Sequence, residues 1–170
     1  MGGGNRMIVL RFLAAVSLVL LVLPSSLRAE PPGQWFGAGV QFNQYASPQV
    51  NGVLAYAKKV AGNEKPTYSY TAVNFLSVQK KPFRVMTTTE TGIAQWVTRF
   101  RKMDFFALGT AGLAASGSGG GTNTGYSVSG GIIGQTAIRK GVTIGPYYRV
   151  TKSSLSEVQH AVGLMIGLRD

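Results

Sequence analysis

His160 is the only histidine of the chain, and histidine is the side chain best suited to act as a general base near neutral pH. Ser154, Ser156 and Glu157 lie close to it in sequence, and serine and carboxylate groups are common partners of a catalytic histidine. Nucleophilic catalysis needs the base within hydrogen-bonding reach of the nucleophile, which closeness in sequence does not provide. We therefore expect no catalytic site, and interpret His160 as a residue near the start of a β-strand.

Other chemically useful residues do not cluster. Acidic residues occur singly, so neither paired carboxylates nor a metal-ligand spacing is present. The glycine-rich stretch 117–125 lacks the Gly-Lys-Ser/Thr ending of a phosphate-binding loop, and we interpret it as a flexible loop. The absence of cysteine excludes disulfides and thiolate chemistry. We expect no metal, cofactor or catalytic residue; the acidic residues are Glu30, Glu64, Glu90, Asp104, Glu157 and Asp170.

The first 29 residues have the three-part layout of a secretory signal peptide. Arg6 and Arg11 form a basic start, residues 12–23 are apolar, and a short polar exit ends at Ala29. The apolar run is shorter than the ~20 residues that a membrane-spanning helix needs. We therefore expect an exported protein, with a signal peptide over 1–29 and one folded domain over 30–170.

Two details of this export signal stay open. Leu27 is larger than the small residue usual three positions before a cleavage site, so an uncleaved N-terminal anchor is the alternative to cleavage after Ala29. Met7 is an alternative start to Met1.

The composition is poor in charge and rich in glycine. Charged residues make up 14% of the chain, against the roughly 25% usual in soluble proteins, and there are 23 glycines. Removing the three arginines of the first 29 residues lowers the formal net charge from +11 to +8. A nucleic-acid-binding module would not normally carry an export signal, so we expect no nucleic acid as partner. Contact with anionic lipid head groups is the simpler interpretation.

Alternation of apolar and small or polar residues recurs after residue 30, whereas a sustained 3.6-residue period does not. This pattern predicts an all-β domain of about eight antiparallel strands. Turn-like clusters place the strands at 34–44, 51–60, 67–77, 83–97, 103–115, 125–139, 142–151 and 158–168.

Four of the predicted strands have one apolar face and one small or polar face. In the last strand Val162, Leu164, Ile166 and Leu168 share a face, and Ala161, Gly163, Met165 and Gly167 share the other. The first strand separates Phe36, Ala38, Val40 and Phe42 from Gly37, Gly39, Gln41 and Asn43 in the same way. The sixth strand sets Tyr126, Val128, Ile132 and Ile138 against Ser127, Ser129, Gly131, Gln135 and Arg139. The seventh sets Val142, Ile144, Pro146, Tyr148 and Val150 against Thr143, Gly145, Tyr147, Arg149 and Thr151.

The third and fourth predicted strands are less regular. Either register of the third puts polar residues on the apolar side, Asn74 in one case and Ser69 with Thr71 in the other. Alternation is lost around Thr87 to Glu90, which a β-bulge would explain.

Alternation alone does not decide which face points outward, because a soluble lipocalin-like barrel also alternates, with its apolar face inward. The second face here consists mainly of Gly, Ala, Ser, Thr and Gln, which suits the interior of a narrow barrel better than a hydrated surface. A basic residue at a lipid-facing midpoint would cost about 2 to 4 kcal/mol. Arg139 and Arg149 accordingly lie on the non-apolar face, and we expect Glu90 inside, paired with an internal Arg or Lys.

Aromatic residues near predicted strand ends fit the two interfacial rings of a membrane barrel, with packing in a β core as the alternative. They are Trp35, Phe36, Tyr45, Tyr68, Phe83, Trp96, Phe105, Phe106, Tyr126 and Tyr147. The short connection 139–141 predicts a tight periplasmic turn, and the glycine-rich stretch an external loop.

These features together resemble the small outer-membrane β-barrel family of the OmpA/OmpX type. The signal peptide, the eight alternating segments and the terminal run from Val158 to Leu168 carry the resemblance. It implies an up-and-down transmembrane barrel that meets lipid, lipopolysaccharide and the outer-membrane assembly machinery. Family members commonly end in an aromatic residue, whereas this chain ends Leu168-Arg169-Asp170, which departs from the standard assembly signal. In the lipid A deacylases of similar shape a serine follows the histidine by two residues, but Val162 stands there.

The expected function is therefore that of an integral, monomeric outer-membrane barrel with a structural or surface-interaction role. Its side-chain-filled lumen predicts no general pore. The alternatives are a soluble exported lipocalin-like barrel that binds a small apolar ligand, and a lipid-modifying enzyme.

Overall fold

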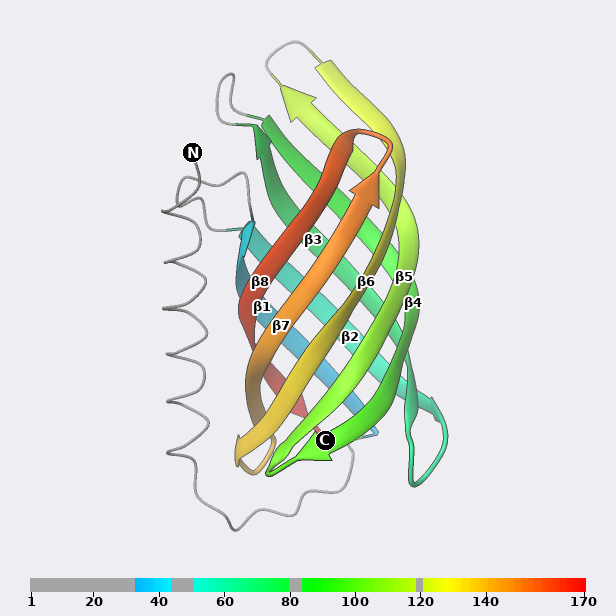
Figure 1. Ribbon diagram of the computed structural model, residues 1–170, viewed down its shortest axis with the longest axis vertical. Coiled ribbons are helices and arrows are strands. Elements are labelled where there is room, and N and C mark those ends of the chain that lie inside the picture. The colour runs from blue at the N-terminus through cyan, green and yellow to red at the C-terminus, as the bar shows by residue number, and fades with distance from the viewer. Residues whose placement is uncertain (1–32, 44–50, 80–83, 119–120) are drawn as a thin grey trace.

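Eight antiparallel strands form a closed up-and-down barrel in the computed structural model, which describes residues 33–43, 51–79, 84–118 and 121–170 (Figure 1). Each strand pairs with its neighbours in sequence, and β1 closes the ring against β8. The strands are β1 (Gln34–Asn43), β2 (Asn51–Ala61), β3 (Thr67–Gln79), β4 (Arg84–Phe100), β5 (Met103–Ser118), β6 (Gly121–Arg139), β7 (Val142–Ser153) and β8 (Ser156–Arg169). The predicted fold class, strand number and strand order are confirmed.

The glycine-rich stretch is the main departure from the predicted boundaries. Strand β5 continues to Ser118 and β6 begins at Gly121, where the two residues pair. Most of 117–125 is therefore strand, and its interpretation as a flexible loop was wrong. Ladder hydrogen bonds use backbone groups alone, so a strand that lacks apolar side chains gives no alternation by which to recognise it.

The two ends of the barrel differ in what they carry. One end, here named the turn end, holds Gly33, Asp170 and the connections 62–66, 101–102 and 140–141. The backbone N–H of Gln34 donates to the Asp170 carboxylate there at 3.1 Å. The opposite end, the loop end, holds the β5–β6 connection and the 154–155 turn. The tight 139–141 turn and the glycine-rich stretch thus lie at opposite ends, as predicted.

The β-bulge predicted near Thr87 to Glu90 was wrong. Strand β4 keeps continuous register there with both β3 and β5, and shifts instead between Trp96 and Thr98. Thr88 and Glu90 are buried while Thr89 is exposed, so the alternation persists. Threonine is found on both faces of this strand, which hides the period in the sequence.

One wall of the barrel is taller than the other. Strands β3 to β6 contain 13 to 19 residues, whereas β1, β2, β7 and β8 contain 10 to 14. The pairing of β6 with β7 begins at Ser127; Tyr126 still hydrogen-bonds Ser154 of the β7–β8 turn, and the β6 residues before it form ladder pairs with β5. The β5–β6 hairpin therefore extends past the β7–β8 turn at the loop end (Figure 1). Among the described residues, no helix is long and apolar enough to cross a membrane.

Candidate functional site

Strand β8 shows which way the two faces of the barrel point. Ile166 and Leu168 are 56% and 61% exposed, whereas Ala161 and Met165, on the alternate face, are 4% and 3% exposed. Gly163 and Gly167 are buried with them. The predicted division of this strand into an outward apolar face and an inward small face is confirmed, and β1 and β7 follow the same rule.

Large apolar side chains cover the outside of the barrel on every strand. This surface, named the apolar belt, has the opposite polarity to that of a water-soluble barrel, whose apolar face lines a cup. A lipocalin-like carrier does not fit it. The belt includes Phe36, Val40, Leu54, Tyr56, Val60, Phe75, Ile93, Val97, Phe100, Leu113, Tyr126, Val128, Ile132, Ile138, Tyr148, Val158, Ile166 and Leu168.

Charged residues avoid the belt's middle. Apart from Glu90 and Arg149, all charged side chains in the described part of the chain lie in turns or within three residues of a strand end. Arg139 differs from its predicted inward placement, because the register of β6 shifts between Ala137 and Arg139 and the side chain is exposed beside the turn. The outward surface between the ends is thus free of charge in the described ranges.

Polar outward residues in β3 satisfy their hydroxyls locally. The structure selects the register with Asn74 inside and Ser69 and Thr71 outside. The Ser69 hydroxyl donates to the backbone carbonyl of Lys58 at 3.2 Å, and Thr71 Oγ1 lies 3.4 Å from Thr91 Oγ1. Such local hydrogen bonds lower the cost of placing a hydroxyl against hydrocarbon.

The lumen contains an ion pair between Glu90 of β4 and Arg149 of β7. Their side chains are 0% and 4% exposed, and Arg149 Nη2 donates to Glu90 Oε2. The prediction that Glu90 lies inside and pairs with an internal basic residue is confirmed. Because β4 and β7 are not adjacent in the ring, the pair ties together strands that share no backbone ladder.

Hydroxyl groups from two further strands hydrogen-bond to this pair. Thr110 of β5 donates to Glu90 Oε2 at 2.6 Å, and Ser129 of β6 donates to Glu90 Oε1 at 3.1 Å. Arg149 Nη2 also donates to Ser129 Oγ at 2.7 Å and Nη1 to the Tyr147 hydroxyl at 3.4 Å. Burial of two charges is favourable only when such additional hydrogen bonds satisfy them. Sequence reasoning did not single out Thr110, and only its inward parity with Glu90 across the β4–β5 pair could have indicated it.

Aromatic rings fill the lumen between this network and the turn end. Trp35, Tyr68, Tyr70, Phe106 and Tyr147 are each at most 4% exposed and belong to one core cluster with Ala57, Ala94, Ile133 and Met165. The Tyr68 and Phe106 rings meet edge to face with centroids 5.6 Å apart. We name these five rings the aromatic plug.

The prediction that aromatic residues near strand ends form interfacial rings was wrong for several of them. Trp35, Tyr68, Phe106 and Tyr147 point into the lumen, so the alternative of core packing holds for them, whereas Phe36 and Tyr126 do face outward. Trp96 is half-buried against the plug and donates from Nε1 to Asp104 at 3.0 Å. Tyr45 and Phe83 lie outside the described residues.

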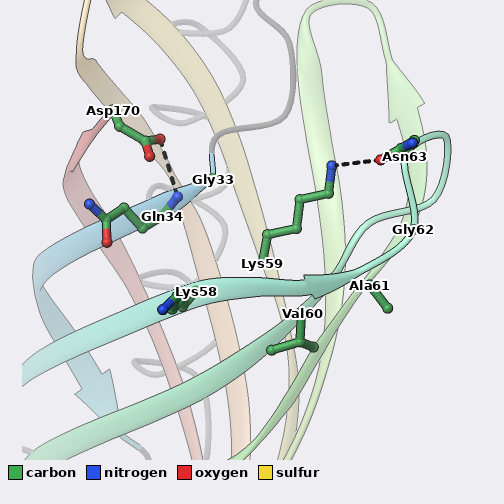
Figure 2. Close-up of a pocket in the computed structure, with 9 residues that line it drawn as sticks. All are labelled: Gly33, Gln34, Lys58, Lys59, Val60, Ala61, Gly62, Asn63 and Asp170. Carbon is green, nitrogen blue, oxygen red and sulfur yellow. Dashed lines mark hydrogen bonds between the residues drawn. The ribbon is translucent and has the colours of Figure 1, made fainter.

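The lumen is tightly filled around Arg149. The hollow beside Arg149, lined by Tyr70, Leu108, Thr110, Ser129 and Gly130, has no room for a water molecule. A larger shallow hollow of about 520 Å³ opens at the turn end, beside Lys58, Lys59 and Asp170 (Figure 2). Lys59 donates there to Asn63 at 3.3 Å.

His160 lies on the outer surface of β8, four residues after the strand begins at Ser156. Its Nδ1 is 3.0 Å from the Tyr148 hydroxyl, and the two rings stack with centroids 6.3 Å apart. Histidine and tyrosine are amphipathic and suit the level of lipid head groups. Among the described residues no three His, Asp or Glu side chains gather as metal ligands would.

Comparisons with known proteins agree with this architecture. No family model matches the chain, and no curated protein matches it. The outer-membrane protein Ail of Yersinia pestis, solved in a phospholipid bilayer nanodisc, has a TM-score of 0.50 and 12% identity, covering 81% of this chain and 99% of that one.

Two other solved structures show similar coverage. A crystal structure of Ail, the attachment invasion locus protein of Yersinia pestis, has a TM-score of 0.48 and 12% identity, covering 82% of this chain and 99% of that one. A de novo designed transmembrane β-barrel has a TM-score of 0.43 and 11% identity, covering 82% of this chain and 100% of that one. The likeness to Ail in the nanodisc concerns the fold alone, and with it the chain has the fold of the small eight-stranded outer-membrane β-barrels.

Proposed function

We propose that this chain is an integral outer-membrane β-barrel with a structural or surface-interaction role. The orientation of the two strand faces carries the proposal: apolar side chains cover the outside and polar or small ones line the inside. An aqueous environment would leave a contiguous apolar surface exposed around the whole barrel. A tilted transmembrane strand needs about 9 to 11 residues. The shortest strand here has 10, so every strand is long enough to cross a bilayer.

A general pore does not fit this lumen. The aromatic plug occupies the half near the turn end, and the Glu90–Arg149 network lies beyond it. Eight-stranded barrels are just wide enough for side chains to fill. Recordings from the purified protein in planar bilayers should show no discrete single-channel currents; steady currents of uniform size would contradict this part of the proposal.

A non-enzymatic role is proposed for the same chain. His160 pairs with a tyrosine hydroxyl on the outer surface, whereas a serine nucleophile would need a base at hydrogen-bonding distance. Incubating the protein with lipopolysaccharide and phospholipid, followed by mass spectrometry, should give unmodified lipids. Lipid cleavage that His160→Ala abolishes would instead support the enzyme alternative.

The partners proposed are outer-membrane lipid, lipopolysaccharide and the assembly machinery, with export by the 1–29 signal peptide and a monomeric state. The β5–β6 hairpin supports a surface-interaction role, since it extends beyond the β7–β8 turn at the loop end. This end is the external one if the short turns and both chain ends are periplasmic, as is usual for such barrels.

Membrane integration can be tested in two ways. The protein should stay in the membrane pellet after carbonate washing, and its band should shift between unheated and boiled samples on a detergent gel. Release by carbonate would favour a soluble carrier and refute the proposal.

A further inference from the structure

Basic side chains gather at the turn end of the barrel. The described residues of this end include nine basic and three acidic side chains. The loop end holds Lys152 and Glu157; Lys80 and Lys81 lie outside the described residues, and the side chain of Arg84 is likewise undescribed. The turn-end basic residues are Lys58, Lys59, Lys65, Arg99, Arg101, Lys102, Arg139, Lys140 and Arg169, and the acidic ones are Glu64, Asp104 and Asp170.

These charges occupy repeated positions relative to the apolar belt. Strands β4, β6 and β8 all run toward the turn end, and each closes its outward face with a large apolar side chain followed directly by arginine. Phe100, Ile138 and Leu168 are 65%, 41% and 61% exposed. The arginines that follow are Arg101, Arg139 and Arg169. This repeat places each arginine just past the last outward apolar side chain of its strand, at the level where lipid phosphates lie; Arg169 itself pairs with inward-facing Trp35, at the mouth of the barrel.

Neighbouring strands bring the basic residues together around the rim. The N–H of Arg169 donates to the carbonyl of Gly141 at 2.9 Å, which sets Arg169 beside the turn that contains Lys140. Gln34 of β1 pairs with Lys58, and Trp35 pairs with Arg169, so only one strand separates these two basic residues. The acidic residue Asp104 is already engaged by Arg99 at 2.7 Å, which leaves the excess positive charge unbalanced.

Arg101 has a backbone conformation that favours glycine. Its φ of 55° lies in the left-handed region, where glycine is at ease and a side chain is disfavoured. The guanidinium lies 5.7 Å from the centroid of the Phe100 ring. The strained position therefore holds an arginine directly over the last apolar residue of β4.

We propose that the turn end is a binding surface for anionic phospholipid head groups, with Arg101, Arg139 and Arg169 as its phosphate contacts. The inference rests on the proposed membrane integration and deepens it by naming a lipid class. Guanidinium groups bind phosphate by paired, charge-assisted hydrogen bonds. Given the usual placement of short turns, these lipids belong to the periplasmic leaflet.

Electron paramagnetic resonance of spin-labelled lipids tests this binding directly. The mature chain, folded in phosphatidylcholine vesicles, should associate with spin-labelled phosphatidylglycerol about threefold to fivefold more than with spin-labelled phosphatidylcholine, roughly the effect of one basic contact per lipid. The triple variant Arg101→Gln/Arg139→Gln/Arg169→Gln should bring this ratio close to one. Lysine at the same three positions, and Lys152→Gln at the loop end, should preserve it.

Several results would overturn the proposal. A ratio near one for the unmodified chain would do so, as would a ratio unchanged in the triple glutamine variant. A preference for spin-labelled lipid A without one for phosphatidylglycerol would assign the arginines to lipopolysaccharide instead. Should the triple variant fail to fold, raising the salt concentration on the unmodified chain must lower the ratio, because screening weakens exposed contacts. A chain that shows no heat-dependent band shift in these vesicles would refute membrane integration itself, whereas a shifted band without lipid preference refutes this inference alone.

Discussion

The two faces of the same strands follow opposite rules. Outside, Ile166 and Leu168 are large and exposed, and replacement by another apolar residue would change little. Inside, Met165, Gly163 and Arg149 are buried, and each meets specific neighbours from other strands. The outer face is selected for polarity alone, whereas the inner face is selected for shape and hydrogen bonding. The same substitution made on each face therefore tests this distinction.

The largest effect is expected from removing one partner of the lumen ion pair. Glu90→Ala leaves Arg149 buried without its carboxylate, which should lower the free energy of unfolding by about 3 to 5 kcal/mol. Urea unfolding in lipid vesicles, followed by the gel band shift, measures this. The double variant Glu90→Leu/Arg149→Met should recover much of the loss, because it removes both charges. If Glu90→Gln kept full heat resistance, the pair would have no role in stability.

A charge on the outer face should cost energy according to its depth. Leu164 lies near the middle of β8, so Leu164→Arg should destabilise the barrel in vesicles by about 2 to 4 kcal/mol. Leu168→Arg, near the turn end, should cost about 0 to 1 kcal/mol. The same unfolding measurement compares the two variants. Equal costs at both positions would argue against a bilayer around the belt.

Threonine offers a matched comparison between the faces. Thr110→Val removes an inward hydroxyl that donates to Glu90 at 2.6 Å, and hydrogen bonds to charged groups are worth about 1.5 to 3 kcal/mol. Thr71→Val removes an outward hydroxyl whose neighbour is Thr91 at 3.4 Å, and should change stability by less than about 0.5 kcal/mol. Similar losses from both variants would mean that the two faces are not distinguished by hydrogen bonding.

The smallest difference in stability between the two faces is expected from glycine substitutions. A methyl group added at Gly92 would lie 2.0 Å from the backbone carbonyl oxygen of Gly109, whereas one added at Gly109 meets nothing within 4 Å. We expect Gly92→Ala to cost about 1 to 3 kcal/mol through overpacking. Gly109→Ala should stay within about 0.5 kcal/mol of the parent chain. Thermal unfolding in detergent ranks these variants, and the reverse order would contradict the assignment of faces.

Much of the fold was predictable because side-chain alternation is a local signal. The alternating faces of β1, β7 and β8 located those strands, and the small, mostly uncharged residues of the other face chose the outward direction for the apolar one. Glu90 was expected inside, and the inward parity of Arg149 was visible. A basic partner inside the lumen was expected for Glu90, but its identity as Arg149 was not, because 59 residues separate the two and only the closed ring brings β4 opposite β7.

The wrong predictions concern segments whose residue types do not show which way a side chain points. Glycine has no side chain to alternate, so the β5–β6 hairpin resembled a loop. Threonine fits both faces, so Thr87 to Glu90 suggested a bulge that does not exist. Aromatic rings near strand ends can point outward to an interface or inward to a plug, and closeness to an end does not decide between them. Trp35 lies on the strand face opposite outward Phe36, and this parity alone predicts that its ring points inward.

The direction of the two faces in a bilayer is the central claim, and single-cysteine labelling of β8 tests it most directly. The chain has no cysteine, so Ala161→Cys through Ile166→Cys can each carry one nitroxide without interference. In lipid vesicles, labels at 162, 164 and 166 should be readily relaxed by membrane-dissolved oxygen, and those at 161 and 165 should not. Oxygen accessibility that peaks at 161 and 165 instead would place the apolar face inside and contradict the membrane-barrel account.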